Sequence, residues 1–418
     1  MVDDSKQTGS ASIRLPAGLA ALRERNFVLY VIGQFTSRWG DWIELTAVSW
    51  ILYELTNSPL LLGLSGVFRA LPVIVLGLFG GAIADRVPRR PLLMFTESAM
   101  LVVSFTVGLL ALSGGLAFWH LYILNVVSGT LSAFSVPARQ ALFAGLVPRT
   151  AIQSAVTLNS FAVRAGGFIG PTVGGVALVL GGYSLPFFLN AASFLGIIFA
   201  LVAMRLPQAA ADATTPRLSL ARGMTEGVGF VWRNAPLRVV LGLELVSGLF
   251  GHNSTLMTII ARDILYTGPE GLGFLLSALG AGAMLGMTLM VAFQVQRHAR
   301  LILTVGGLYA LLWGAAALSP FLWLSMILFF ALGTADGVWG VARNTLAQLL
   351  VPDALRGRVM SVVMLVTRGG SQLGTIQGGL LVGVIGASAA VLTSAAIIGA
   401  AVLRSWRVKL PDHAPLES

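Results

Sequence analysis

Residues 80–93 read GGAIADRVPRRPLL, which places one acid and three arginines in a short gap between two almost wholly apolar stretches. Apolar residues dominate the whole chain, since 56% of its 418 residues are hydrophobic and only 11% are charged. Water-soluble proteins carry about 25% charged residues, so we infer that most of this chain lies in lipid. A membrane-spanning helix needs about 20 apolar residues, and the charged gap therefore marks a connection between two spans.

Apolar runs of membrane-spanning length recur along the sequence and are separated by short polar connections. They predict an all-α integral membrane protein with twelve transmembrane helices. The chain contains no cysteine, which excludes disulfides and thiolate metal ligands. It also lacks a phosphate-binding glycine loop and a metal-spaced histidine cluster, so we expect no metal site, no cofactor and no enzymatic activity. The predicted spans lie near residues 27–52, 59–84, 91–113, 118–138, 155–180, 184–205, 239–261, 270–293, 301–319, 321–345, 358–383 and 385–404.

Arginines gather in every second connection, whereas the intervening connections carry only Arg262. By the positive-inside rule the arginine-rich connections and both termini lie in the cytoplasm, which predicts a multi-pass protein of the cell (inner) membrane. The net charge of +10 then forms a belt beside membrane lipids. We therefore expect lipid contact and no nucleic-acid partner.

The chain repeats itself in two halves. A shift of 204 residues brings Arg139 onto Arg343 and Arg164 onto Arg368, and it also aligns four glycines of the fifth span with four of the eleventh. Because an even number of spans separates the copies, both halves have the same orientation, and in this arrangement the transport site lies between them near the midplane. We divide the chain into a cytoplasmic N-terminal segment (1–26), a six-helix half (27–206), a cytoplasmic linker (207–236), a second six-helix half (237–404) and a cytoplasmic tail (405–418).

The loop GAIADRVPRR, residues 81–90, resembles the signature Gly-x-Leu-Ala-Asp-Arg-x-Gly-Arg-Arg of the major facilitator superfamily, with Ile83 and Pro88 as departures. The first hundred residues and the stretch ARDILYTGPEGLGFLLSALGAGAMLG (261–286) resemble its drug:proton antiporter branch, which includes the enterobactin exporter and macrolide efflux proteins. This resemblance implies the major facilitator fold and a conformational latch of the outward-open state. The alternative interpretation of these arginines is a simple cytoplasmic anchor. The implied latch residues are Gly81, Asp85, Arg86, Arg89 and Arg90.

The fifth span contains GGFIGPTVGG, residues 166–175. Glycines at every fourth position line one helix face and allow a neighbouring backbone to approach closely. The sequence also resembles the antiporter motif Gly-x-x-x-Gly-Pro-x-x-Gly-Gly, which implies export rather than import. Ordinary packing of small residues is the alternative. The residues concerned are Gly166, Gly170, Pro171, Gly174 and Gly175.

Ionisable residues at membrane depth cost about 2.5 kcal/mol or more each and are functional candidates. In the first span Arg38, Asp41 and Glu44 recur at a spacing of three, so they share one helix face. Arg69 in the second span lies at similar depth. We predict a cluster in which Asp41, or otherwise Glu44, carries a proton; a purely structural ion pair is the alternative. Asn125 replaces an arginine that many proton-coupled members of the superfamily have, so coupling should rest on the first two spans.

Further polar and aromatic residues are candidates for the wall of a substrate cavity. In the architecture that the resemblance implies, the first, fourth, seventh and tenth spans surround this cavity. The repeat-related arginines of the fifth and eleventh spans could bind an anionic cargo or balance the acids. The candidates are Trp39, Arg164, Glu244, His252, Asn253, Asp336, Trp339 and Arg368.

Together these features predict a secondary active transporter. We expect it to export a small amphiphilic molecule, such as a drug, a macrolide or a siderophore-like compound, by alternating access and proton-coupled antiport. Its partners would be the small-molecule substrate, protons and membrane lipids, and the protein would act as a monomer. The alternatives are a lipid or lysolipid flippase on the same fold and a transport-inactive membrane sensor.

Overall fold

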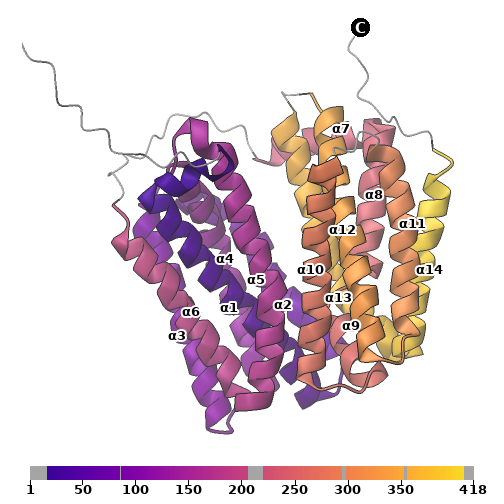
Figure 1. The fold of residues 1–418 in the computed structure, drawn as a ribbon, viewed down its shortest axis with the longest axis horizontal. Coiled ribbons are helices and arrows are strands. Elements are labelled where there is room, and N and C mark those ends of the chain that lie inside the picture. The colour runs from indigo at the N-terminus through magenta and orange to yellow at the C-terminus, as the bar shows by residue number, and fades with distance from the viewer. Residues whose placement is uncertain (1–16, 85, 206–219, 294–297, 353–354, 409–418) are drawn as a thin grey trace, which may run out of the picture.

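The computed structural model describes residues 17–84, 86–205, 220–293, 298–352 and 355–408. Within these ranges every regular element is a helix. Figure 1 shows two helical bundles side by side, one formed by the indigo to magenta part of the chain and the other by the orange to yellow part. These bundles correspond to the two halves of the sequence repeat.

The first bundle contains six long helices and two short 3-10 turns, at Ala17–Arg23 and Arg149–Ala151. Its helices are α1 (Arg25–Thr56), α2 (Pro59–Ala84), α3 (Arg89–Leu112), α4 (Phe118–Ala144), α5 (Ile152–Gly181) and α6 (Ser184–Ala203). Helix α7 (Leu220–Arg233) lies in the segment predicted as a linker. The second bundle contains α8 (Ala235–Phe250), α9 (Ser254–Ile259), the π-helical turn η3 (Ile260–Ile264), α10 (Pro269–Phe293), α11 (His298–Ala317), α12 (Leu322–Leu350), α13 (Arg356–Ile385) and α14 (Ala387–Ser405).

The twelve predicted spans correspond to these helices, which confirms the predicted fold class. Among the described residues, nine helices are by themselves long and apolar enough to cross a membrane. The other three spans are those that interrupt the apolar pattern. Helix α1 carries three charged residues near its middle, α13 carries Arg368, and the seventh span is divided into α8, α9 and η3.

The division of the seventh span differs from the continuous run predicted at residues 239–261. Helix α8 ends at Phe250, and the side chain of Asn253 starts α9 by accepting a hydrogen bond from the Leu256 amide at 3.0 Å. The backbone N–H of His252 donates to the Tyr309 hydroxyl at 3.0 Å. Backbone groups freed inside a membrane must find partners in neighbouring helices, and α11 supplies one of them here.

The two halves meet through repeat-related helix pairs, α5 with α10 and α13 with α2. Gly175 in α5 packs against the Pro269 carbonyl at the start of α10, and Gly379 packs against the Pro59 carbonyl at the start of α2. The hydroxyl of Thr375 donates to the Gly63 carbonyl at 3.0 Å. The sequence repeat is therefore also a repeat of contacts between the halves.

One end of the bundle, which we name the closed end, is joined across the halves by polar contacts. Arg262 of η3 donates to the Tyr53 carbonyl at 2.9 Å and to Oδ1 of Asn57 at 2.7 Å. Its guanidinium lies 4.8 Å from the centre of the Tyr53 ring, and the Tyr53 hydroxyl donates to Asp263. The contacts of Arg262 and Asp263 thus tie η3 to the end of α1.

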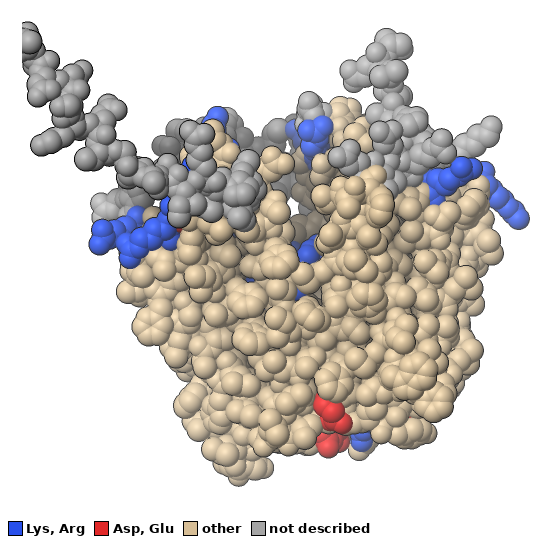
Figure 2. All heavy atoms as spheres, in the orientation of Figure 1, with Lys and Arg blue, Asp and Glu red and all other residues tan. Residues whose placement is uncertain are grey.

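The opposite end carries most of the arginines and is open between the bundles (Figure 2). The buried apolar residues follow the same division. The largest cluster joins both halves and includes Ile51, Leu62 and Leu256, whereas separate clusters around Phe27 and Val359 each belong to one half. The structure is therefore closed at the Arg262 end and open at the arginine-rich end.

We predict that Gly379→Ala destabilises this arrangement, because the added methyl group would collide with the Pro59 carbonyl oxygen. Overpacking of this kind costs about 1–3 kcal/mol, so the purified variant should unfold at a lower temperature than the natural protein. Gly383→Ala in the same helix is the matched control, since a methyl group there meets nothing within 4 Å. Equal unfolding temperatures for the two variants would contradict the inferred contact.

Candidate functional site

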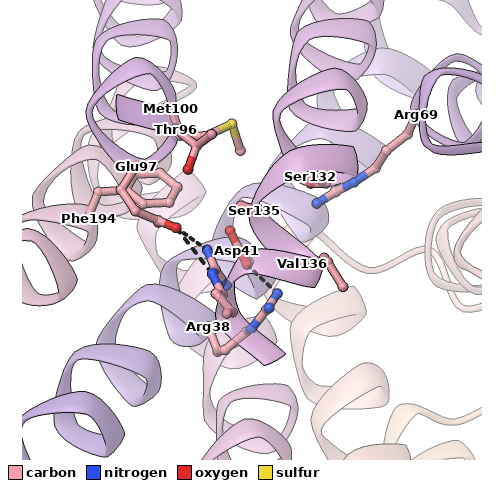
Figure 3. A pocket seen from close by; sticks show the side chains of 11 residues that line it. Arg38, Asp41, Arg69, Thr96, Glu97, Met100, Ser132, Ser135, Val136 and Phe194 are labelled. Atoms are coloured by element: carbon pink, nitrogen blue, oxygen red, sulfur yellow. Dashed lines mark hydrogen bonds and ion pairs between the residues drawn. The ribbon is translucent and has the colours of Figure 1, made fainter. Parts of the chain in front are cut away.

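A small cavity in the middle of the first half brings together several of the predicted charged residues (Figure 3). Arg38 and Asp41 come from α1, Arg69 from α2, Glu97 from α3 and Arg139 from α4. The volume open to water is about 40 Å³, enough for a few water molecules or one small charged group. The remaining lining residues are Thr96, Met100, Ser132, Ser135, Val136 and Phe194.

The glycine face of α5 holds the charged segment of α1 in place. An added methyl group at Gly166 would lie 3.3 Å from the backbone of Arg38, and one at Gly170 would lie 2.9 Å from the Trp39 carbonyl oxygen. A methyl group added at Gly174 would lie 2.8 Å from the Ile43 carbonyl oxygen. The predicted close approach therefore occurs, and it occurs against the residues that flank Asp41. Pro171 is buried in the same helix.

Asp41 is the acid of the first span that borders the cavity. Arg38 donates from a terminal nitrogen to its Oδ2 at 3.1 Å, and the side chains remain 31% and 18% exposed. Figure 3 shows Arg69 directed toward the same cavity from α2. Within the described residues Arg69 forms no hydrogen bond or ion pair, so its positive charge is balanced only by the field of nearby acids.

Glu44, the second predicted proton carrier, has a different environment. It is only 4% exposed, and its Oε2 accepts hydrogen bonds from Ser104 at 2.8 Å and from Asn190 at 2.6 Å. It does not line the cavity. Its partners come from α3 and α6, so Glu44 ties three helices together and lacks the direct route to water that Asp41 has.

Glu97 and Arg139 form a buried ion pair that the sequence analysis did not identify. Glu97 is 1% exposed and accepts a hydrogen bond from Nε of Arg139 at 3.2 Å and another from a terminal nitrogen of the same guanidinium. Arg139 also reaches the Gln34 side chain at 3.4 Å. The alignment of Arg139 with Arg343 in the repeat was the signal that could have found this pair.

Arg343 holds a buried glutamate as well, but not the equivalent one. Its guanidinium pairs with Glu244 of α8, and Nε1 of Trp339 donates to the same carboxylate at 2.8 Å. In the first half the corresponding arginine binds an acid of α3. The two halves therefore repeat their arginines while differing in the helices that supply the acids.

The remaining candidates of the second half surround the break in the seventh span. The His252 ring nitrogen Nδ1 lies 2.8 Å from the Tyr309 hydroxyl, and Asn253 donates to the Gly374 carbonyl at 3.1 Å. Asp336 interacts electrostatically with His252 and with Arg164 of the first half. His252 and Asn253 thus have structural partners, and Asp336 faces both halves.

Two of the predicted latch residues, Arg89 and Arg90, form described hydrogen bonds. Arg89 donates to the Ala141 carbonyl at 3.1 Å and Arg90 to the Val202 carbonyl at 2.9 Å, near the ends of α4 and α6. Cations at helix C-termini are stabilising, and both contacts stay inside the first half. Arg86 is exposed and Gly81 belongs to α2, whereas Asp85 lies outside the described residues.

Three candidates lie on interhelical surfaces without a described polar partner. Trp39 stacks on Phe35 with ring centres 6.0 Å apart, and its indole nitrogen is buried without a hydrogen bond among the described residues. Arg164 and Arg368 are exposed at equivalent positions of α5 and α13. Among the described residues no group of three His, Cys, Asp or Glu side chains could hold a metal ion.

We predict that Arg139→Gln strongly destabilises the protein, because Glu97 would remain buried without a positive partner. Removing one member of a buried pair costs about 3–5 kcal/mol, so the unfolding temperature of the purified protein should fall clearly. The double variant Glu97→Gln, Arg139→Gln should recover part of this loss, since it leaves no unpaired charge.

The matched control for this prediction is Arg358→Gln, which breaks an ion pair with Glu226 whose side chains are 29% and 39% exposed. Exposed pairs contribute about 0–1 kcal/mol, so this variant should stay close to the natural protein. If Arg139→Gln and the double variant lost equal stability, the pair with Glu97 would not be the cause.

Comparisons with known proteins identify the family of this chain. The sequence profile of a family described as transmembrane secretion effector matches residues 16–418. The multidrug efflux pump Tap of Mycolicibacterium fortuitum is 27% identical over 376 residues, covering 87% of this chain and 91% of the pump. The enterobactin exporter of Shigella boydii serotype 4 is 26% identical over 312 residues, covering 73% of each protein.

A solved structure shares the fold. The crystal structure of a D-xylose-proton symporter is 14% identical in sequence and matches with a TM-score of 0.71, over 93% of this chain and 98% of the symporter. At this level of identity the likeness concerns the fold alone. With the family profile spanning nearly all of its length, the chain belongs to the transmembrane secretion effector family of the major facilitator superfamily.

Proposed function

We propose that this transporter exports a small amphiphilic molecule by proton-coupled antiport, with Asp41 as the proton carrier. The observation that carries the proposal is the position of Asp41, half-way along α1, partly exposed in a cavity and paired with Arg38. A carboxylate in such a place can exchange a proton with water, whereas the fully enclosed Glu44 cannot do so without breaking bonds to α3 and α6.

The direction of transport and the class of cargo rest on the relatives and on the glycine motif. The two relatives described above bear names that describe a multidrug efflux pump and an enterobactin exporter. The antiporter-like glycines of α5 contact the same segment of α1 that carries Asp41. Proton uptake by Asp41 would therefore change a contact on which the position of α1 depends.

The proposed cycle uses the two ends of α1. In the present state Asp41 is paired with Arg38, the arginine-rich end is open, and Arg262 binds the far end of α1. About twelve residues, or roughly 18 Å of helix, separate Asp41 from Tyr53. Cargo would enter from the cytoplasm in the present state and leave on the outer side after the bundle inverts. Protonation of Asp41 from the outer side would then release Arg38 and favour return to the present state, in which the proton is lost to the cytoplasm.

The proposed orientation in the membrane rests on the positions of the arginines. We place the arginine-rich end, the linker and both termini in the cytoplasm and the Arg262 end outside, in a monomer in the cell (inner) membrane. Because the natural chain has no cysteine, single cysteines placed at Asn57 and at Ser405 would test this orientation. A membrane-impermeant maleimide added to intact cells should label the first variant and not the second.

We predict that Asp41→Asn abolishes gradient-driven transport. In inverted membrane vesicles with an acidic lumen, the natural protein should accumulate members of a panel of dyes, macrolides and catecholate siderophores, because outward movement of protons drives cargo inward. The Asp41→Asn variant should lose this accumulation, since it has no group to carry the proton. Uptake of fluorescent members of the panel, with and without the pH gradient, measures the effect.

Glu54→Gln is the matched control, because it removes an acid from the same helix at the closed end, remote from the cavity. It should retain gradient-dependent uptake. Movement that depends on neither the gradient nor Asp41 would contradict antiport and would favour a flippase. A complete lack of cargo movement in the natural protein, with correct folding, would favour a sensor.

A further inference from the structure

Two arginines related by the repeat lie where the halves separate. The close glycine contacts between α5 and α10 run from Gly175 at the closed end to Gly167, which packs on Gly280. Those between α13 and α2 run from Gly379 to Gln372, which contacts Gly66. Arg164 and Arg368 follow within one further helical turn toward the open end, one on each side of the interface between the halves.

Neither arginine has a described acid at ion-pair distance. Both side chains are exposed, although Arg164 lies near the middle of α5 and Arg368 near the middle of α13. The acid that interacts electrostatically with Arg164 is Asp336, which belongs to the other half. Arg164 also precedes Gly167 by three residues and Gly175 by eleven, so it lies on the face of α5 that packs against α10.

The other acids at this depth already have partners. Asp41 binds Arg38, Glu97 binds Arg139, and Glu244 binds Arg343. Glu44 is enclosed by Ser104 and Asn190. This pairing leaves Arg164, Arg368 and Arg69 without an ion-pair partner in the described part of the membrane domain.

Charged groups at membrane depth are costly unless they face water or a partner of opposite charge. Figure 2 shows Lys or Arg atoms inside the opening between the bundles. A guanidinium binds carboxylate, sulfonate and phosphate groups with two parallel hydrogen bonds, which makes arginine better suited than lysine to such anions. An anion that enters the opening would meet one guanidinium from each half.

We propose that Arg164 and Arg368 form a two-sided binding site for the anionic group of the cargo, so that the transported molecule is an anionic amphiphile. This inference deepens the proposed function and rests on it, because it assumes that the bound anion is the transported molecule. Binding of the anion can nevertheless be tested without transport. The ligand of this site is an apolar molecule that carries a carboxylate, sulfonate or phosphate group. It is either a soluble cargo or a lipid with an anionic headgroup.

The test uses two dyes with the same ring system and opposite charge. Fluorescein is an anion at neutral pH and rhodamine 6G is a cation. Binding of each to the purified protein in nanodiscs of phosphatidylcholine is measured by fluorescence anisotropy at low salt. The variants are Arg164→Gln, Arg368→Gln and the double variant, and Arg300→Gln is the matched control because it removes an exposed arginine at the start of α11.

We expect fluorescein to bind the natural protein and the Arg300→Gln control equally. Each single variant should bind it about tenfold or more weakly, since it loses a hydrogen bond between two charged groups. The double variant should lose more than either single variant. Rhodamine 6G should bind no more weakly to the variants than to the natural protein.

Fluorescein binding that is unchanged in the double variant, or equal losses for both dyes, would overturn the proposal. So would a natural protein that binds the cation in preference to the anion. Adding the anionic lipid phosphatidylglycerol to the nanodiscs distinguishes a lipid ligand from a soluble one. If this lipid weakens fluorescein binding, the site binds a lipid headgroup. If fluorescein binding is undiminished, the site binds a soluble anion.

The outcome is independent of proton coupling. A protein that binds fluorescein through the two arginines but moves cargo without a pH gradient would refute antiport and leave the site intact. Gradient-driven uptake of cargo together with fluorescein binding that is unchanged in the double variant would refute the site and leave antiport intact.

Discussion

The close approach of α1 to α5 is the contact on which the candidate site depends. Lipid gives apolar helices no hydrophobic reason to associate, so helices in membranes pack through small residues that let backbones touch. Gly166, Gly170 and Gly174 provide such a surface, and the backbone from Arg38 to Ile43 lies directly on it. A larger residue at any of these positions would displace the part of α1 that carries Asp41. The same helix reaches the closed end, where Arg262 holds its Tyr53 carbonyl. One packing surface thus determines where the proposed proton site lies and how it is connected to the far end of the bundle.

The two halves share a backbone plan but not a distribution of charge. Their glycines make corresponding contacts, as Gly175 does with Pro269 and Gly379 with Pro59. Their arginines also correspond, yet Arg139 pairs with an acid of α3 whereas Arg343 pairs with an acid of α8. The common backbone gives two similar surfaces between the halves, along which the proposed rocking motion would occur. The unequal charges give each half its own role, with the water-accessible Asp41 in the first and the His252 and Tyr309 contact in the second.

The sequence predicts the helices well and the site less well, for physical reasons. Apolar length and alternating arginines are local properties, so the twelve spans could be read directly. The break at Gly251–Asn253 could not, because the polar residues His252 and Asn253 are too few to divide a run of membrane-spanning length. The partners that stabilise the break, Tyr309 and Gly374, are distant in the chain. The spacing of Asp41 and Glu44 likewise places both on one face of α1. Their difference arises from Ser104 and Asn190, which come from α3 and α6 and enclose only Glu44.

Antiport of an anion imposes a condition on where the proton binds. If the cargo contacted Arg38 directly, protonation of Asp41 would free that guanidinium and hold the anion more tightly, which is the wrong sign for release. The geometry avoids this conflict. The cavity around Asp41 is lined by first-half residues only, whereas Arg164 and Arg368 belong to different halves and lie at the opening between them. Protonation can then act on the cargo through the position of α1, by selecting which end of the bundle is open.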